Sequence, residues 1–164
     1  MSETNTAPEQ GTIGIRNIYL KDSSFEAPST PHIFNEKANP DINVNIGVDS
    51  KDLGNNFFEV IISITITAKI EEKTAFLAEV HQGGVFEISG FDTNTQRAIK
   101  GIFCPTQLFP YAREAVSSLI GRGGFPPLLL EPINFEEMFA QQATSTTENI
   151  DKIDNIDKDK AKQH

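Results

Sequence analysis

The fold is decided by the stretch FFEVIISITITAKI (residues 57–70), which continues through EEKT into AFLAEVHQGGVFEIS (residues 75–89). In the first run every even-numbered position from Phe58 to Ile70 is apolar, and most odd-numbered positions are polar. The second run repeats this alternation, with Phe76, Val80 and Ile88 among the apolar positions. A period of two with β-branched residues is typical of a strand with one buried face. The short polar link therefore predicts an antiparallel hairpin.

Two further strands precede this hairpin. Residues 12–26 alternate less cleanly, but they predict a first strand on which Asp22 and Glu26 point the same way if the chain stays extended. Residues 42–48 alternate strictly and predict a second strand. The pair Gly83-Gly84 predicts a bulge or a close backbone approach, without a change of face.

The period changes after the hairpin. Residues 90–105 have no clean period, and we interpret them as a long crossover that could hold one helical turn at residues 96–100. Apolar residues at helical spacing then predict a helix over residues 106–121, with Pro110 acceptable only near its start and glycines at its end. A second helix is expected after Pro132, with Asn134 as its cap.

Length and composition indicate one folded domain with two polar ends. We expect residues 1–11 to be disordered, residues 12–142 to form the domain, and the charged residues 143–164 to form a disordered tail. No apolar run of 18 residues is present, so we expect no membrane insertion. The N-terminus lacks the pattern of a secretory signal, and Cys104 is the only cysteine, which together predict a cytoplasmic protein.

The charge of the chain limits its partners. With 14 basic and 23 acidic residues the formal net charge is −9, which argues against nucleic-acid binding because phosphate contacts need Lys and Arg. Such a charge suits a basic partner, or it serves solubility alone.

The sequence contains no convincing active site, and we predict no catalytic, cofactor or metal site and therefore no enzyme. Glu79 and His81 share one strand face and could bind a metal or shuttle a proton. No local feature activates Cys104, which we interpret as a structural thiol. A small metal-dependent hydrolase that uses these three residues remains an alternative.

Apolar residues outside the strands are unusually numerous. A layer of four strands and two helices would struggle to cover all of them, which predicts self-association or a partner site. The phenylalanines concerned are Phe103, Phe109, Phe125, Phe135 and Phe139.

Three long blocks resemble the bacterial export chaperone family SecB: IYLKDSSFEAPSTPHIF (18–34), TAFLAEVHQGGVFEISG (74–90) and FCPTQLFPYAREAVSSLIGRGGFPPLLLEPINFEEMF (103–139). The resemblance implies an α+β fold, in which a four-stranded antiparallel sheet has two helices packed on one face. It also implies a homotetramer, a dimer of dimers, with the helix at residues 106–121 in its core. The implied function is that of an ATP-independent holdase, which binds unfolded precursor proteins and delivers them to the SecA ATPase for export.

The resemblance also implies three sets of site residues. For binding of SecA it implies Asp22, Glu26, Leu77 and Glu79. For binding of clients it implies Phe103, Leu108, Phe125, Leu128, Leu130, Phe135, Met138 and Phe139. For the oligomer interface it implies Ala78, Val80 and Gln82, together with Tyr111, Ala115 and Leu119 on the long helix. A SecB-like chaperone dedicated to a single partner, such as an antitoxin, is the alternative within the same fold.

Overall fold

The computed structural model describes residues 10–146, which form two compact units with their boundary between Glu131 and Pro132. This boundary lies inside the range 12–142 that we expected to be one domain. The predictions of disorder for residues 1–9 and 147–164 fall outside the described residues. Residues 135–146 are helical, so the second helix extends four residues past the predicted end of the domain.

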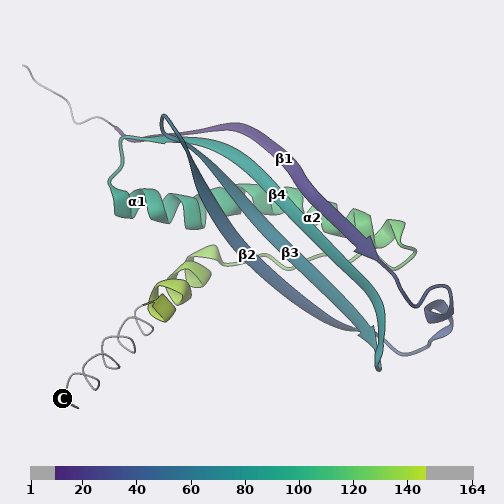
Figure 1. Ribbon diagram of the computed structural model, residues 1–164. Helices are drawn as coiled ribbons and strands as arrows, with labels where there is room; N and C mark the ends of the chain where they lie inside the picture. The colour runs from purple at the N-terminus through teal and green to yellow at the C-terminus, as the bar shows by residue number, and fades with distance from the viewer. Residues whose placement is uncertain (1–9, 147–164) are drawn as a thin grey trace, which may run out of the picture. The chain divides into compact units, whose positions relative to one another are not determined.

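The first unit contains one antiparallel sheet in the order β1-β4-β3-β2 (Figure 1). Its strands are β1 (Thr12–Glu26), β2 (Asp41–Gly54), β3 (Phe57–Ile70) and β4 (Lys73–Ser89). The predicted hairpin is confirmed as β3 and β4, which are joined at Glu71 and Glu72. A short 3-10 helix, η1 (His32–Asn35), lies between β1 and β2.

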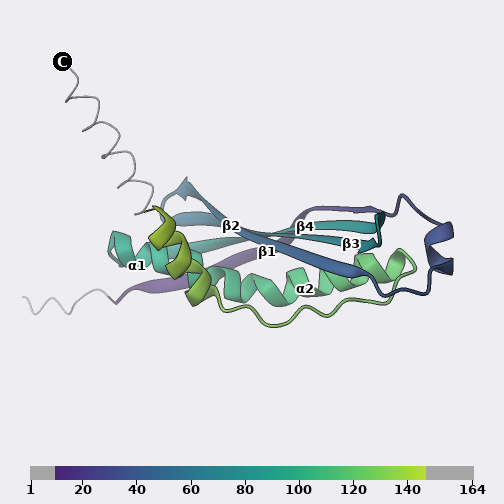
Figure 2. The same cartoon turned by 90° about the horizontal axis from the view of Figure 1, so that it is seen from below.

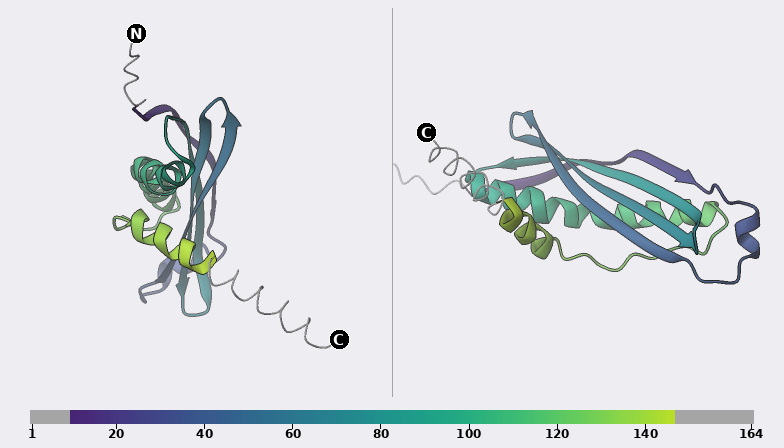
Figure 3. Two further views of the ribbon diagram at one scale, coloured as in Figure 1. Left: turned by 90° about the vertical axis from the view of Figure 1, so that its left-hand side faces the viewer. Right: turned by 60° about the horizontal axis from the view of Figure 1, so that its bottom comes forward.

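A nearly continuous helical segment runs along one face of this sheet (Figures 2 and 3). It consists of α1 (Thr93–Ala98), the π-helical turn η2 (Ile99–Phe103) and α2 (Cys104–Arg122). We call the sheet face under α2 the inner face and the opposite face the outer face. The α+β class and the four-stranded antiparallel sheet are thereby confirmed.

The core lies between α2 and the inner face of β3 and β4. The even-numbered residues from Phe58 to Ile70 and from Phe76 to Ile88 are buried, while most of their odd-numbered neighbours are at least partly exposed on the outer face. Each fully buried aliphatic side chain contributes about 1.5–3 kcal/mol relative to an exposed one. The largest fully buried members of this core are Phe86, Ile62, Ile64, Ile66, Ile88, Leu108, Ile120, Val60, Val80 and Val116.

Residues 96–100 are helical as predicted, but the helical part of the segment 90–105 is longer, because the chain is helical from Thr93 onward. Asp92 caps the start of this helix, and its carboxylate accepts a hydrogen bond from the backbone N–H of Thr95 at 2.7 Å. The π turn inserts an extra residue into the helical repeat, so the apolar positions before and after it are out of phase. A search of the sequence for one constant helical spacing of apolar residues therefore misses the turns that precede α2.

Pro110 lies inside α2 and not near the start of the helix, contrary to the prediction. A proline in this place leaves the carbonyl of Thr106 without its helical donor. Both residues are exposed, so water can satisfy that carbonyl. The predicted glycine ending is confirmed, because Gly124 follows the helix with a φ of +84°.

Gly83 and Gly84 are places of close approach. A Cβ at Gly83 would lie 2.7 Å from the ring of Tyr19 on the outer face. A Cβ at Gly84 would lie 2.8 Å from Leu108 of α2 and from Phe86 on the inner face. The bulges of this sheet region lie instead in β1, where the register against β4 shifts between Ile15 and Asn17 and again between Leu20 and Asp22.

The second unit is described by itself. Its helical residues 135–146 begin after Asn134, whose side-chain oxygen accepts a hydrogen bond from the backbone N–H of Glu137 at 3.2 Å. The predicted cap is therefore confirmed. Throughout residues 10–146, no helix combines the length and the apolar character that crossing a membrane would require.

Candidate functional site

The first candidate surface lies on the outer face, at the β1–β4 pair. Asp22 lies opposite His81, and Glu26 lies opposite Leu77, so these side chains share one face with Glu79. We call Asp22, Glu26, Leu77 and Glu79 the acidic face. No bulge separates Asp22 from Glu26, which is why their predicted common direction holds. The sheet thus brings together all four residues of the predicted SecA set.

His81 lies within this acidic surface. One ring nitrogen contacts the Glu79 carboxylate at 2.5 Å, and the other lies 3.3 Å from the hydroxyl of Ser63 on β3. Leu77 is the apolar member of the acidic face and remains partly exposed. The surface therefore presents three carboxylates around one apolar side chain, which suits a basic segment that also carries an apolar residue.

The residues of the hydrolase alternative do not come together. Glu79 and His81 lie on the outer face, whereas Cys104 is fully buried at the start of α2 on the inner side of the sheet. Burial raises the pKa of the Cys104 thiol to about 12, which keeps it protonated and unreactive at neutral pH. Among residues 10–146, no group of three or more His, Cys, Asp or Glu side chains is arranged to hold a metal ion.

The second candidate surface is a cleft of about 480 Å³ in the first unit, which we call the aromatic cleft. Its walls come from η1 and the segment after it, from the β3–β4 turn region, and from the segment after α2. Ile33, Phe34, Phe76, Phe125 and Leu128 provide much of its apolar lining. The carboxylate of Glu36, at its rim, accepts a hydrogen bond from Lys73 at 2.8 Å.

Four phenylalanines form a cluster at this cleft. The ring centroid of Phe125 lies 4.9 Å from that of Phe76, 5.1 Å from that of Phe34 and 6.3 Å from that of Phe25. Phe25 and Phe76 are stacked at 5.9 Å. Phe34 is 51% exposed, so the cluster offers aromatic surface to solvent. A concave apolar surface with adaptable aromatic walls suits extended apolar segments of another chain.

Only some of the predicted client residues lie at the aromatic cleft. Phe125 and Leu128 line the aromatic cleft. Leu108 is fully buried over Gly84 and offers no surface to a client, and Leu130 is almost buried. Phe103 is exposed at the π turn, away from the residues that line the cleft. The remaining three, Phe135, Met138 and Phe139, belong to the second unit and stay predictions.

Sequence reasoning missed Phe34 and Phe76 as candidate binding residues. The parity of Phe76 on β4 indicates only a core position. Phe34 follows the proline-rich loop, and an aromatic residue beside such a loop is the signal that the sequence offers. Their proximity to Phe125 depends on contacts between distant segments, which no local pattern reports.

The residues assigned to the oligomer interface fall into two groups. The first group, on the inner face of β4, consists of Ala78, Val80 and Gln82, which are at most 4% exposed. Substitutions there would act on assembly indirectly, by changing how α2 packs on the sheet. Tyr111, Ala115 and Leu119 lie four residues apart on one side of α2, and Tyr111 is 52% exposed.

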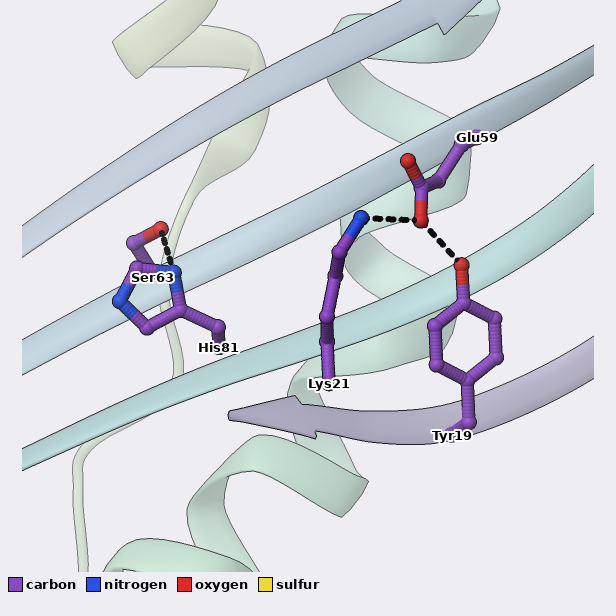
Figure 4. A network of polar contacts seen from close by, with 5 residues as sticks. All are labelled: Tyr19, Lys21, Glu59, Ser63 and His81. Atoms are coloured by element: carbon purple, nitrogen blue, oxygen red, sulfur yellow. Dashed lines mark hydrogen bonds and ion pairs between the residues drawn. The ribbon is translucent and has the colours of Figure 1, made fainter. Parts of the chain in front are cut away.

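A polar network on the outer face links β1 to β3 (Figure 4). Glu59 accepts hydrogen bonds from the Tyr19 hydroxyl at 2.5 Å and from the Lys21 ammonium at 2.7 Å, both at the same carboxylate oxygen. These two bonds, that of Lys21 first, lower the pKa of Glu59. Burial, followed by the bond to Glu59, raises the pKa of Tyr19 to about 12.

Comparisons with known proteins agree on one family. Residues 6–146 match the family model described as preprotein translocase subunit SecB. The protein-export protein SecB of Methylococcus capsulatus is 49% identical over 142 residues, which cover 87% of this chain and 91% of that protein. The corresponding protein of Hydrogenovibrio crunogenus is 46% identical over 150 residues, which cover 89% of this chain and 99% of that protein.

A solved structure extends the comparison. It is a SecB-like chaperone of Mycobacterium tuberculosis in complex with a peptide from the HigA1 antitoxin. The likeness has a TM-score of 0.57 at 25% identity and covers 74% of this chain and 90% of the other. The family match over residues 6–146 and the export relatives, which are 46–49% identical over nearly their whole length, lead to one conclusion: the chain belongs to the SecB family.

Proposed function

We propose that this protein is an ATP-independent cytoplasmic holdase, which binds unfolded precursor proteins and delivers them to the SecA ATPase for export. The observation that carries the proposal is the partly exposed aromatic cleft in a chain of the SecB family. An extended apolar segment that enters the cleft gains about 25 cal/mol for each Å² removed from water. Several such contacts can hold an unfolded chain without chemistry or nucleotide.

Native mass spectrometry with and without an unfolded precursor tests this proposal. We expect the free protein to have the mass of a homotetramer, and we expect the unfolded precursor to form a stable complex with it without ATP. The folded form of the same precursor is the matched control, because its apolar segments are buried and cannot enter the cleft. If no complex forms between the protein and unfolded precursors, the holdase proposal is contradicted.

The tetramer itself is a proposal, a dimer of dimers with the α2 helices in its core. It is supported by apolar surface that one chain leaves uncovered. Tyr111 on α2 is half exposed, and Ile15 and Leu20 of the edge strand β1 are exposed although they lie on the inner side of the sheet. A second copy that covers these residues would remove exposed apolar patches, which soluble proteins rarely retain.

We further propose the acidic face as the docking site for a basic segment of SecA. Replacing Glu79 by lysine should weaken SecA binding about tenfold or more, because like charges then face each other at the interface. The measurement is SecA affinity by calorimetry at low and high salt, since screening should reduce the difference. Asp49→Lys is the control, because it makes the same charge change on the outer face at the opposite edge strand, β2. Equal affinity of wild type and Glu79→Lys would contradict the assignment.

A dedicated chaperone of one partner is the second candidate. It is favoured by the antitoxin peptide bound to the SecB-like chaperone of Mycobacterium tuberculosis. The protein-export relatives are more similar in sequence, at 49% against 25% identity, and they favour general export. Binding of a single client among many unfolded precursors would support the dedicated role.

A further inference from the structure

The irregular alternation of β1 is caused by two one-residue bulges. The register against β4 shifts around Arg16 and again around Lys21. As a result, the residues of β1 on the inner face come in pairs, and each pair begins five positions after the one before it. These inner-face pairs are Ile13 with Ile15, Ile18 with Leu20, and Ser23 with Phe25.

The bulge at Lys21 determines which residues of the last part of β1 face outward. Beyond it, Asp22 lies opposite His81 and Glu26 lies opposite Leu77 on the outer face, whereas Phe25 lies opposite Ala78 on the inner face. Side chains of a strand alternate with a period of two, so a slip of one residue moves each of them to the other face. Without the extra residue, both carboxylates would point inward and Phe25 would point outward.

Side chains next to this bulge contact β4 and β3 on the outer face. The Tyr19 ring lies over Gly83, where a side chain would collide with it. Tyr19 and Lys21 then reach across β4 to the same Glu59 oxygen on β3 (Figure 4). We call Tyr19, Lys21 and Glu59 the clamp. It joins the bulge residue Lys21, and Tyr19 two positions before it, to β3, the strand beyond the direct partner of β1.

The same phase of β1 serves both candidate surfaces. On the outer face it places Asp22 and Glu26 within the acidic face. On the inner face it places Phe25 against Phe76 and Phe125 of the aromatic cluster. Loss of the bulge would therefore disturb two surfaces on opposite sides of the sheet at once.

We propose that Tyr19, Lys21 and Glu59 are positioning residues, whose clamp sets the phase of β1 and so positions the SecA-docking carboxylates and the aromatic cleft together. The consequence for binding rests on the function proposed above, whereas the consequence for the strand does not. The experiment is therefore designed with one readout for the strand and two for binding.

The test uses Glu59→Ala in the full-length protein. Amide hydrogen exchange of residues 22–26 should accelerate about tenfold, because the variant loses the acceptor of both clamp hydrogen bonds. Affinity for SecA and affinity for an unfolded precursor should each fall about fivefold or more, although Glu59 belongs to neither surface. Exchange in the centre of β3 should stay at the wild-type rate.

Two control variants separate positioning from charge and from general damage. Glu59→Gln loses the charge but keeps an acceptor oxygen, so it should stay within roughly twofold of wild type in all three readouts. Glu87→Ala removes the same charge and the ion pair with Arg16 at the first bulge. Because that bulge precedes the clamp, exchange of residues 22–26 should not change.

The possible outcomes are distinct. Wild-type exchange at residues 22–26 in Glu59→Ala would overturn the inference. So would changed exchange together with unchanged affinities, provided that wild type binds both partners. If wild type binds neither partner, the proposed function fails and the exchange data still decide whether the clamp sets the strand. If Glu59→Ala does not fold, Tyr19→Phe replaces it, which keeps the ring over Gly83 but loses the donor and should show a smaller acceleration.

Discussion

Replacing Phe34 and Phe125 together by alanine should lower affinity for unfolded precursors about a hundredfold, since buried aromatic anchors of an interface cost roughly 1–3 kcal/mol each when truncated. The two rings lie 5.1 Å apart in the aromatic cleft, and Phe34 is half exposed. Their loss should therefore remove binding surface more than core packing. The measurement is suppression of precursor aggregation over a range of chaperone concentrations, together with affinity by fluorescence anisotropy.

Leu129→Ala is the matched control for this double variant. Leu129 is 73% exposed, lies in the same segment after α2, and does not line the aromatic cleft. It should bind precursors with wild-type affinity. If the double variant and Leu129→Ala protect a precursor equally well, clients bind elsewhere and the assignment of the cleft is wrong.

Replacing Gly84 by alanine should lower the free energy of unfolding far more than a glycine-to-alanine change at an open position of the sheet. The new Cβ would lie 2.8 Å from Leu108 and from Phe86, which are both fully buried and cannot move aside. Overpacking of this kind costs about 1–3 kcal/mol. Urea unfolding at a fixed protein concentration measures the change, because the stability of an oligomer depends on concentration.

Gly47→Ala is the control for this prediction. Gly47 lies in β2 of the same sheet, and a Cβ there would meet nothing within 4 Å. Its free energy of unfolding should stay near that of wild type or rise by about 0.4–1 kcal/mol, since alanine restricts the unfolded chain. Equal stability of Gly84→Ala and Gly47→Ala would show that α2 does not pack on Gly84 as closely as the structure places it.

Part of the acidic face was predictable from sequence because it depends on parity within single strands. Leu77 and Glu79 share a face for the same reason that Phe76 and Ala78 share the other. Asp22 and Glu26 keep a common face because the stretch between them contains no bulge. That the two pairs lie beside one another on the outer face depends on the register of β1 against β4.

The aromatic cleft was predictable only in part. Phe125 and Leu128 were found through the resemblance to SecB, whereas Phe34 and Phe76 were missed. The cleft is assembled from a 3-10 helix, a strand and a loop that are far apart in sequence. Each of these contacts is a tertiary contact, so the residues next to one phenylalanine in the sequence do not predict which other phenylalanines it contacts.

By itself, the sequence determined the β3–β4 hairpin, the second strand, the end of α2 and the cap at Asn134. These features follow from local periods and local hydrogen bonds. Only the tertiary structure decided the bulges of β1, the π turn before α2 and the aromatic cleft. Each bulge or π turn adds one residue to a strand or helix, so the apolar positions after it no longer follow the spacing before it. The contacts beside such an extra residue involve strands that are distant in the chain. The hydrogen bonds from Tyr19 and Lys21 of β1 to Glu59 of β3 are an example.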